Sequence, residues 1–229
     1  MPINNSKISE EVYEILKNEV LSGQYLPGER MPSERDIAKK FEVSRGVARE
    51  SFKKLHQLGL ISIESSGSRV VSIKKCTLDC LGPLLDLNKI PDPKIMDEVL
   101  DIGFYLIDLA VPMAISKNKK LLIEKIKDLK VKKNLNPREL FFIFAEASDH
   151  LVLLFITNGL KKELLGRLEA VGYAPKYDQV IITKLLSDLE DSIRKKDMPK
   201  SIKLLKGAFN FTREELKKNL DQMIMKNRT

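Results

Sequence analysis

With 229 residues, 43% of them hydrophobic, the chain is long enough to bury the cores of two modest domains. Its net charge of +8 favours an anionic partner, although 32 acidic residues accompany the 40 basic ones and exclude a simple polybasic tail. The sequence has no apolar run of about 18 residues and no signal-peptide layout at its N-terminus, so we expect no membrane span and a cytoplasmic protein.

The first predicted helix covers Ser9–Ser22, with Ser9 as its N-cap and Gly23 at its end. Apolar residues recur in it at spacings of three and four and so share one face: Val12, Ile15, Leu16, Val20 and Leu21. We expect this face to cover the helices that follow.

Two short helices joined by a tight turn are predicted between Leu26 and Leu60. Ser33 caps the first helix, and Asp36 follows three residues later in its first turn. Ser44 caps the second helix and Gly59 ends it. The second helix buries one apolar face, formed by Val47, Ala48, Phe52, Leu55 and Leu58.

The polar face of the second helix carries three cations spaced four residues apart: Arg45, Arg49 and Lys53. A helix–turn–helix with arginine near the start of its second helix suits the major groove of DNA, where arginine bonds bidentately to guanine. A merely solvated surface helix would carry the same charges, so the row alone leaves both interpretations open.

A hairpin is predicted directly after the second helix. Leu60–Ile63 and Arg69–Ile73 alternate apolar and polar residues as strands do, and Glu64–Ser68 forms a polar turn that contains Gly67. The first domain is therefore predicted to be a winged helix–turn–helix.

The segment PGERMPSERDIAKKFEVSRGVARESFKKLHQLGLI resembles the N-terminal DNA-binding domain of the GntR family of bacterial regulators, with similarity from Ile8 to Ile73. The resemblance implies DNA-contacting positions at Arg35, Arg45, Gly46 and Arg49, with Gly67 at the wing tip. Lys53 is expected to contact phosphate. Arg69 replaces a second wing glycine of the family, and its own side chain could reach a groove.

We expect three regions: residues 1–75 as the winged domain, 76–93 as a linker with a short docked helix, and 94–229 as an all-helical domain. Glycine and proline residues within 76–93 argue against a long helix there. Cys76 and Cys80 lie four residues apart in this linker. A metal or redox pair is conceivable, but too few further ligands exist for a structural zinc site, and ordinary thiols are the expectation in a reducing cytosol.

Helical periodicity continues through the C-terminal region, so the fold class is mainly α. Pro112 is expected to kink or locally disturb the first of these helices, and Pro137 to occupy the first position of the third. The six predicted helices are Lys94–Ser116, Lys117–Lys133, Asn136–Ser148, Asp149–Gly172, Asp178–Asp197 and Pro199–Lys226.

Together with the head, this architecture resembles the FadR-type branch of the GntR family, and the stretch LFFIFAEASDHLVLLFITNGL is similar to a segment of its effector and dimerisation domains. Many members bind a divalent metal through one aspartate and three histidines. The corresponding positions here hold Pro137, Phe141 (or Phe142), Leu186 and Ala208, so we predict no metal and no other cofactor. His150 is expected to cap a helix or turn.

Apolar residues at the metal positions predict a drier effector cavity formed by Phe141, Phe142, Phe144, Leu186, Ala208 and Phe209. Such a cavity either collapses into core or accepts an amphiphilic ligand such as a fatty acid or acyl thioester. Branch members that bind acyl-CoA share the aromatic substitution, but the last helix lacks their ligand-binding residues and Gly103 replaces an arginine.

No phosphate-binding loop, GxSxG or HExxH motif occurs, so we predict no catalytic residues. The predicted function is a ligand-responsive transcriptional regulator that binds a near-palindromic operator as a homodimer. The alternatives are a small-molecule binding protein with a secondary DNA-binding head, and a helical-bundle enzyme.

Overall fold

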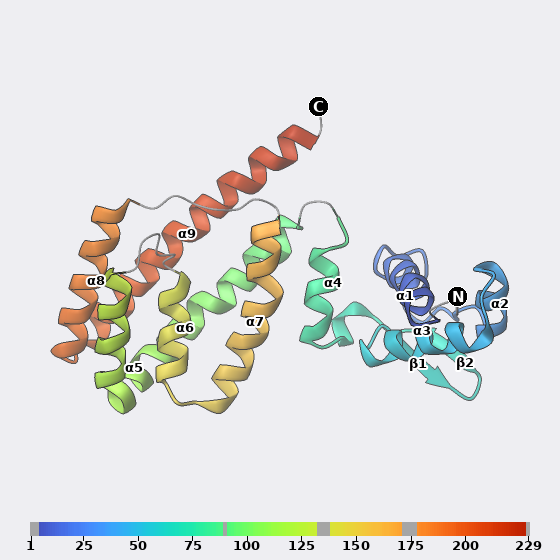
Figure 1. The fold of residues 1–229 in the computed structure, drawn as a ribbon, viewed down its shortest axis with the longest axis horizontal. Helices are drawn as coiled ribbons and strands as arrows, with labels where there is room; N and C mark the ends of the chain where they lie inside the picture. Colours follow the sequence, from blue (N-terminus) through green and yellow to red (C-terminus); the bar gives the residue numbers. More distant parts are fainter. Residues whose placement is uncertain (1–4, 89–90, 132–137, 171–177, 228–229) are drawn as a thin grey trace. The chain divides into compact units, whose positions relative to one another are not determined.

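The computed structural model describes residues 5–88, 91–131, 138–170 and 178–227 (Figure 1). The chain divides into two compact units, Met1–Lys89 and Ile90–Thr229. Each unit has its own hydrophobic core. The two cores mean that the function of each unit can be argued from its own packing.

The N-terminal unit is a three-helix domain with a two-stranded wing, as predicted. Its helices are α1 (Asn5–Leu21), α2 (Glu34–Lys40) and α3 (Arg45–Gln57). Strands β1 (Ile61–Glu64) and β2 (Gly67–Val70) pair antiparallel. The core lies where α1 packs against α3, and it includes the fully buried side chains Leu16, Ile37, Leu55, Leu60 and Ile61.

Helix α1 begins at Asn5, so the prediction that Ser9 is its N-cap is wrong. Ser9 lies inside the helix and is buried, and its carbonyl accepts a hydrogen bond from Ser51 Oγ of α3 at 3.0 Å. The end is as predicted, because Gly23 adopts a positive φ of 79° that lets the chain leave the helix. Contact with α3 therefore fixes where the serine lies, which a local capping pattern does not reveal.

The predicted caps of α2 and α3 are confirmed. Ser33 Oγ accepts the N–H of Asp36 at 3.2 Å, and Ser44 Oγ accepts the N–H of Val47 at 3.3 Å. At the other end of α3, Gly59 has a φ of 81°, and Leu60 N–H donates to the Leu55 carbonyl at 3.0 Å. This is a Schellman ending, so both termini of α3 are held by local hydrogen bonds.

The wing is tighter than the sequence predicts. Glu64 pairs with Gly67, which leaves only two residues in a turn that was expected to span Glu64–Ser68. The second strand also starts earlier and ends at Val70, because Ile73–Lys75 forms a 3-10 turn. A third segment joins the hairpin, since Arg30 forms a β-bridge with Arg69. Pairing with this distant segment fixes the register.

The end of the N-terminal unit packs back onto the end of α3. A 3-10 turn and the short helix α4 (Leu81–Leu85) follow the wing. Cys76 Sγ donates to the Gly59 carbonyl at 3.3 Å and Cys80 Sγ to the Leu58 carbonyl at 3.0 Å. Burial, reinforced by the neighbouring thiol, raises the pKa of Cys80 to about 12. Cys80 is therefore a protonated donor at neutral pH.

The C-terminal unit is a helical bundle, as predicted. Its helices are α5 (Pro93–Val131), α6 (Arg138–Ala147), α7 (Leu151–Ala170), α8 (Gln179–Arg194) and α9 (Met198–Asn227) (Figure 1). By length and composition α5 could cross a membrane, but 44% of its most apolar window is buried within the protein. It is packed by α6, α8 and α9, so it is the central helix of the bundle.

The break in the long first helix falls at Asn118, whose φ of −132° and ψ of 42° are not helical. At Pro112, where a kink or local disturbance is expected, the φ and ψ angles remain helical. The Asn118 side chain donates to the Ala147 carbonyl at 2.9 Å, which ties the break to the end of α6. Two predicted helices thus meet at Asn118, while Pro137 lies outside the described residues.

The cap of α3 generates a stability prediction. Replacing Ser44 by Ala removes the acceptor for the Val47 N–H, and we expect the free energy of unfolding to fall by about 1 kcal/mol. Ser44→Asp keeps an acceptor and should remain near the wild-type value. Urea unfolding followed by circular dichroism measures the difference, and equal midpoints for Ser44→Ala and wild type would contradict the capping role.

Candidate nucleic-acid interface

Helix α3 buries one face and exposes the other. Five of its residues, Val47, Ala48, Ser51, Phe52 and Leu55, are buried in the unit. Arg45, Arg49 and Lys53 are all exposed. The three cations therefore form one exposed face, named here the cationic face of α3, and each is about 6 Å further along the helix axis than the last.

The three cations differ in how far acidic neighbours compensate them. Arg49 Nε lies 3.2 Å from Glu34 Oε2 of α2, and Lys53 Nζ lies 2.8 Å from Glu50 Oε1. The hydrogen bond from Lys53 lowers the pKa of Glu50, so that carboxylate is charged at neutral pH. Arg45 has no ion-pair partner among the residues that the structure describes. Arg45 is thus the residue on this face with its charge most available to an anion.

Arg35 follows the cap of α2 and is exposed. The Ser33 hydroxyl donates to the Asp36 carboxylate at 2.6 Å, and this hydrogen bond lowers the pKa of Asp36. The Arg35 guanidinium is exposed and forms no ion pair within the described residues. The first helix of the motif adds a cation at its N-terminal end.

The wing arginines make contacts within the head that the sequence does not reveal. Arg69 Nη1 donates to the Gly28 carbonyl at 3.0 Å, so its side chain bridges back to the segment before α2. The guanidinium of Arg30 lies over Gly67, where an added Cβ would be 2.8 Å from Arg30 Nε. Gly67 also has a φ of 119°, so both space and backbone conformation favour glycine.

Arg30 is a candidate binding residue that the sequence did not indicate. Arg30 is exposed at the wing. A β-bridge between the two backbones places it beside Arg69, which lies 39 positions later in the chain. Spacing along the chain gives no sign of this neighbourhood. The pair places two guanidinium groups on the wing, in addition to the cationic face of α3.

An exposed cationic helix, a capped helix before it and a cationic hairpin after it define a winged helix–turn–helix DNA-binding domain. The comparison with protein families agrees, because residues 8–71 match the family described as bacterial regulatory proteins, gntR family. The N-terminal unit therefore has the fold of a winged DNA-binding domain and matches the gntR family over residues 8–71.

Solved structures resemble the chain at low sequence identity. One, described as Lar, which controls the expression of the Listeria monocytogenes agr system and mediates virulence, has a TM-score of 0.52 and 13% identity, covering 90% of this chain and 95% of that one. A GntR family member from Pseudomonas syringae pv. tomato str. DC3000 has 17% identity, a TM-score of 0.44 and coverage of 96% and 89%. A search of curated proteins finds no match. The first likeness supports the fold.

The residues of the predicted effector cavity are divided between the bundle core and the surface. Phe141, Phe144 and Leu186 are buried in the core, and Phe142 and Phe209 pack against it. The Phe141 ring centroid lies 5.3 Å from that of Phe142 and 6.3 Å from that of Phe209. Aromatic rings thus occupy the interior where the sequence suggested a cavity, and Ala208 instead lines a surface groove.

A close contact explains why Phe209 fills this space. An added Cβ on Gly103 would lie 2.9 Å from Phe209 Cζ, so the ring packs directly onto the glycine backbone of α5. Gly103 is buried, and a larger residue there would push the ring away. Because Gly103 has no side chain, the Phe209 ring of α9 can pack directly against the backbone of α5.

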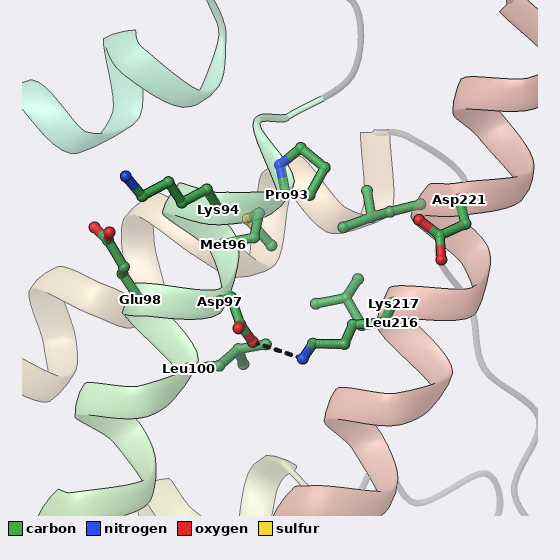
Figure 2. A pocket seen from close by; sticks show the side chains of 10 residues that line it. Pro93, Lys94, Met96, Asp97, Glu98, Leu100, Leu216, Lys217 and Asp221 are labelled. Carbon is green, nitrogen blue, oxygen red and sulfur yellow. Dashed lines mark ion pairs between the residues drawn. The ribbon is translucent and has the colours of Figure 1, made fainter.

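A second cavity lies between the start of α5 and the C-terminal half of α9 (Figure 2). It measures about 540 Å³, and both apolar and charged side chains line it. Figure 2 shows Asp97 and Lys217 facing each other, with 3.2 Å between Nζ and Oδ1. Partial burial raises the pKa of Asp97, but hydrogen bonds from Arg213 and Lys217 outweigh this and lower it. The charges of Asp97 and Lys217 therefore compensate each other.

Two further expectations concern histidine and metals. His150 Nδ1 accepts the N–H of Leu153 at 3.2 Å, which confirms the predicted helix-cap role at the start of α7. Within residues 5–88, 91–131, 138–170 and 178–227, no group of three or more His, Cys, Asp or Glu side chains is placed to hold a metal.

Gly46 allows a test that separates binding from folding. An added Cβ there would meet only Ser44 Oγ, at an ordinary 3.7 Å, so Gly46→Ala should leave the melting temperature unchanged or slightly higher. If the α3 backbone approaches DNA at this point, the variant should bind its operator about tenfold more weakly. Gel shifts at fixed salt measure this. If the folded Gly46→Ala variant binds the operator with wild-type affinity, Gly46 is not part of the DNA interface.

Proposed function

We propose that the protein is a homodimeric, ligand-responsive transcriptional regulator that reads a near-palindromic operator through α3. The observation that carries the proposal is the cationic face of α3, on which Arg45 is exposed and uncompensated within the described residues. Arginine at the start of a recognition helix can reach guanine O6 and N7 in the major groove. Arg45 and Arg49 are proposed as the base-reading residues.

The remaining cations are proposed to position the domain on the DNA backbone. Lys53 lies at the far end of the cationic face, and Arg35 at the start of α2. Arg30 and Arg69 lie on the wing, where they would contact the adjoining groove or its phosphates. Such contacts add affinity for any sequence, whereas base contacts supply the specificity.

Homodimerisation is proposed from exposed apolar residues in the bundle. Ile102, Tyr105 and Leu109 share one face of α5 and are exposed, Tyr105 at 66%. Leu151, Val152, Phe155 and Ile156 share one face of α7, with Phe155 at 65%. Apolar faces of this kind are typical of protein interfaces, and a two-fold dimer would match the symmetry of a palindromic operator.

Ligand response and placement in the FadR-like branch rest on the helical unit and its resemblance to effector domains. Cytoplasmic location accords with a DNA-binding regulator. The alternative function is small-molecule binding with a secondary DNA-binding head. The apolar groove that includes Ala208 supports ligand binding under either proposal.

Base reading predicts a specific pattern in operator binding. Arg45→Ala should cost about 1–3 kcal/mol on the operator and much less on random DNA. Lys53→Ala should weaken binding to both DNAs alike and reduce the salt slope by about one. Fluorescence anisotropy over a salt series measures both quantities. Equal losses on operator and random DNA for Arg45→Ala would refute base reading by this residue.

The ion pair of Arg49 gives an independent control. Glu34 competes with DNA for the Arg49 guanidinium, so Glu34→Gln should tighten binding to DNA while leaving α2 intact. In the Arg49→Ala background, the same substitution should have a smaller effect, because the released group is gone. Additive effects of the two substitutions would show that the ion pair is unrelated to DNA binding.

The dimer proposal predicts the effect of a charge on α7. Phe155→Glu places a carboxylate in the proposed interface and should produce a monomer in sedimentation velocity at micromolar concentration. Val131→Glu is the matched control, because Val131 is an equally apolar residue, 84% exposed, at the end of α5. If the Phe155→Glu variant is still a dimer, this face of α7 is not the dimer interface.

A further inference from the structure

The apolar groove lies along α8 and α9 on the surface of the bundle. Its volume is about 710 Å³. It is lined by apolar side chains from both helices, among them Ile181, Leu185, Leu204, Ala208 and Phe211. These residues define what we name the α8–α9 groove. Ile181 is 64% exposed and Phe211 51% exposed, so a large part of the apolar lining is in contact with water.

A glycine keeps the α9 wall of the groove open. Gly207 lines the groove, and an added Cβ there would meet no described atom within 4 Å. Its backbone is helical, so the position does not require glycine for its conformation. A side chain at this point would occupy the groove without disturbing the packing of the bundle.

The charges along the groove are unequal. Lys200 and Lys203 line one part of it, are exposed, and have no ion-pair partner in the described parts of the chain. The next lysine of α9, Lys206, is already paired with Asp108 at 2.6 Å. Asp178 also lines the groove, but its carboxylate accepts the N–H of Val180 at 2.8 Å as the cap of α8. The uncompensated charge is therefore positive.

Charge and apolar surface are separated along α9. Lys200 and Phe211 are eleven positions apart, which corresponds to about 16 Å of helix axis. Lys200 and Lys203 lie towards the α8–α9 turn, while Phe211 lies further along α9. A ligand that matches both features has an anionic head and a long aliphatic tail. The cavity of Figure 2 does not offer this match, because Lys217 is paired with Asp97.

We propose that the α8–α9 groove binds a long-chain fatty-acid anion, with the carboxylate at Lys200 and Lys203 and the chain along Leu204, Ala208 and Phe211. The inference rests on the proposed ligand response and names its site and ligand class. It places the ligand on the surface of the bundle, whereas the interior is filled by Phe141 and Phe209.

The position of the groove suggests how occupancy reaches the rest of the bundle. Ala208 lines the groove, and its neighbour Phe209 packs onto Gly103 of α5. Further along α9, Arg213 Nε donates to Asp97 at 2.7 Å and its Nη1 to Asp101 at 2.7 Å. Helix α9 would thus bind the aliphatic chain of the ligand on one side, while its other side is held to α5.

The test uses the full-length protein and myristate below its micellar concentration, measured by isothermal titration calorimetry. We expect wild type to bind one myristate per chain. Gly207→Leu fills the groove and should weaken binding at least about tenfold. Lys184→Leu is the matched control, because Lys184 is exposed on α8 but does not line the groove, and it should bind as wild type does.

The head group is tested separately. Lys200→Gln with Lys203→Gln should weaken binding of myristate by about tenfold or more but leave that of uncharged myristyl alcohol unchanged. Wild-type binding by Gly207→Leu, or an equal loss for acid and alcohol in the lysine variant, would overturn the proposal. So would absence of myristate binding together with a change in oligomeric state for Gly207→Leu, which would assign the groove to a second copy of the chain.

The same variants distinguish this inference from the proposed function. Operator binding without myristate depends on the head, so a folded Gly207→Leu variant should retain it. If wild type and the variants bind the operator but none binds myristate, the groove is rejected as the ligand site and the proposed DNA-binding function stands. If the protein binds myristate but no DNA, the proposed regulatory function is rejected and the groove stands as a ligand site.

Discussion

The packing of α3 against α1 is the contact on which the function of the head depends. Leu16 and Leu55 are fully buried in this core, and the Ser51 hydroxyl donates across it to the Ser9 carbonyl. Because one face of α3 is held in this way, the opposite face must point to solvent. The caps at Ser44 and Gly59 then fix where that face begins and ends.

Charge compensation makes the cations of the head unequal. Glu34 and Glu50 neutralise Arg49 and Lys53 in the free protein, whereas Arg45 keeps its charge for an external partner. An anion that binds Arg49 through Nε competes with Glu34, and the cost of that exchange reduces the net affinity at this residue. Because these ion pairs reduce the gain from phosphate charge alone, we expect tight binding to require base contacts as well.

Close packing fills the interior of the bundle and bears on where the proposed ligand could bind. Phe209 fills the interior because Gly103 lets its ring approach the α5 backbone. Packing at this density leaves little internal space, so an apolar ligand requires another surface. The α8–α9 groove supplies one, and Gly207 keeps it open where any other residue would project into it.

The sequence by itself determined the features that depend on near neighbours: the helices, the caps at Ser33 and Ser44, the ending at Gly59 and the cationic row of α3. Local hydrogen bonds and helical periodicity decide all of these within one or two turns of chain. The tertiary structure decided the start of α1, the tight wing, the Arg30–Arg69 bridge and the Arg49–Glu34 pair. It also filled the expected cavity and opened the groove, because the space between helices depends on how distant side chains pack together.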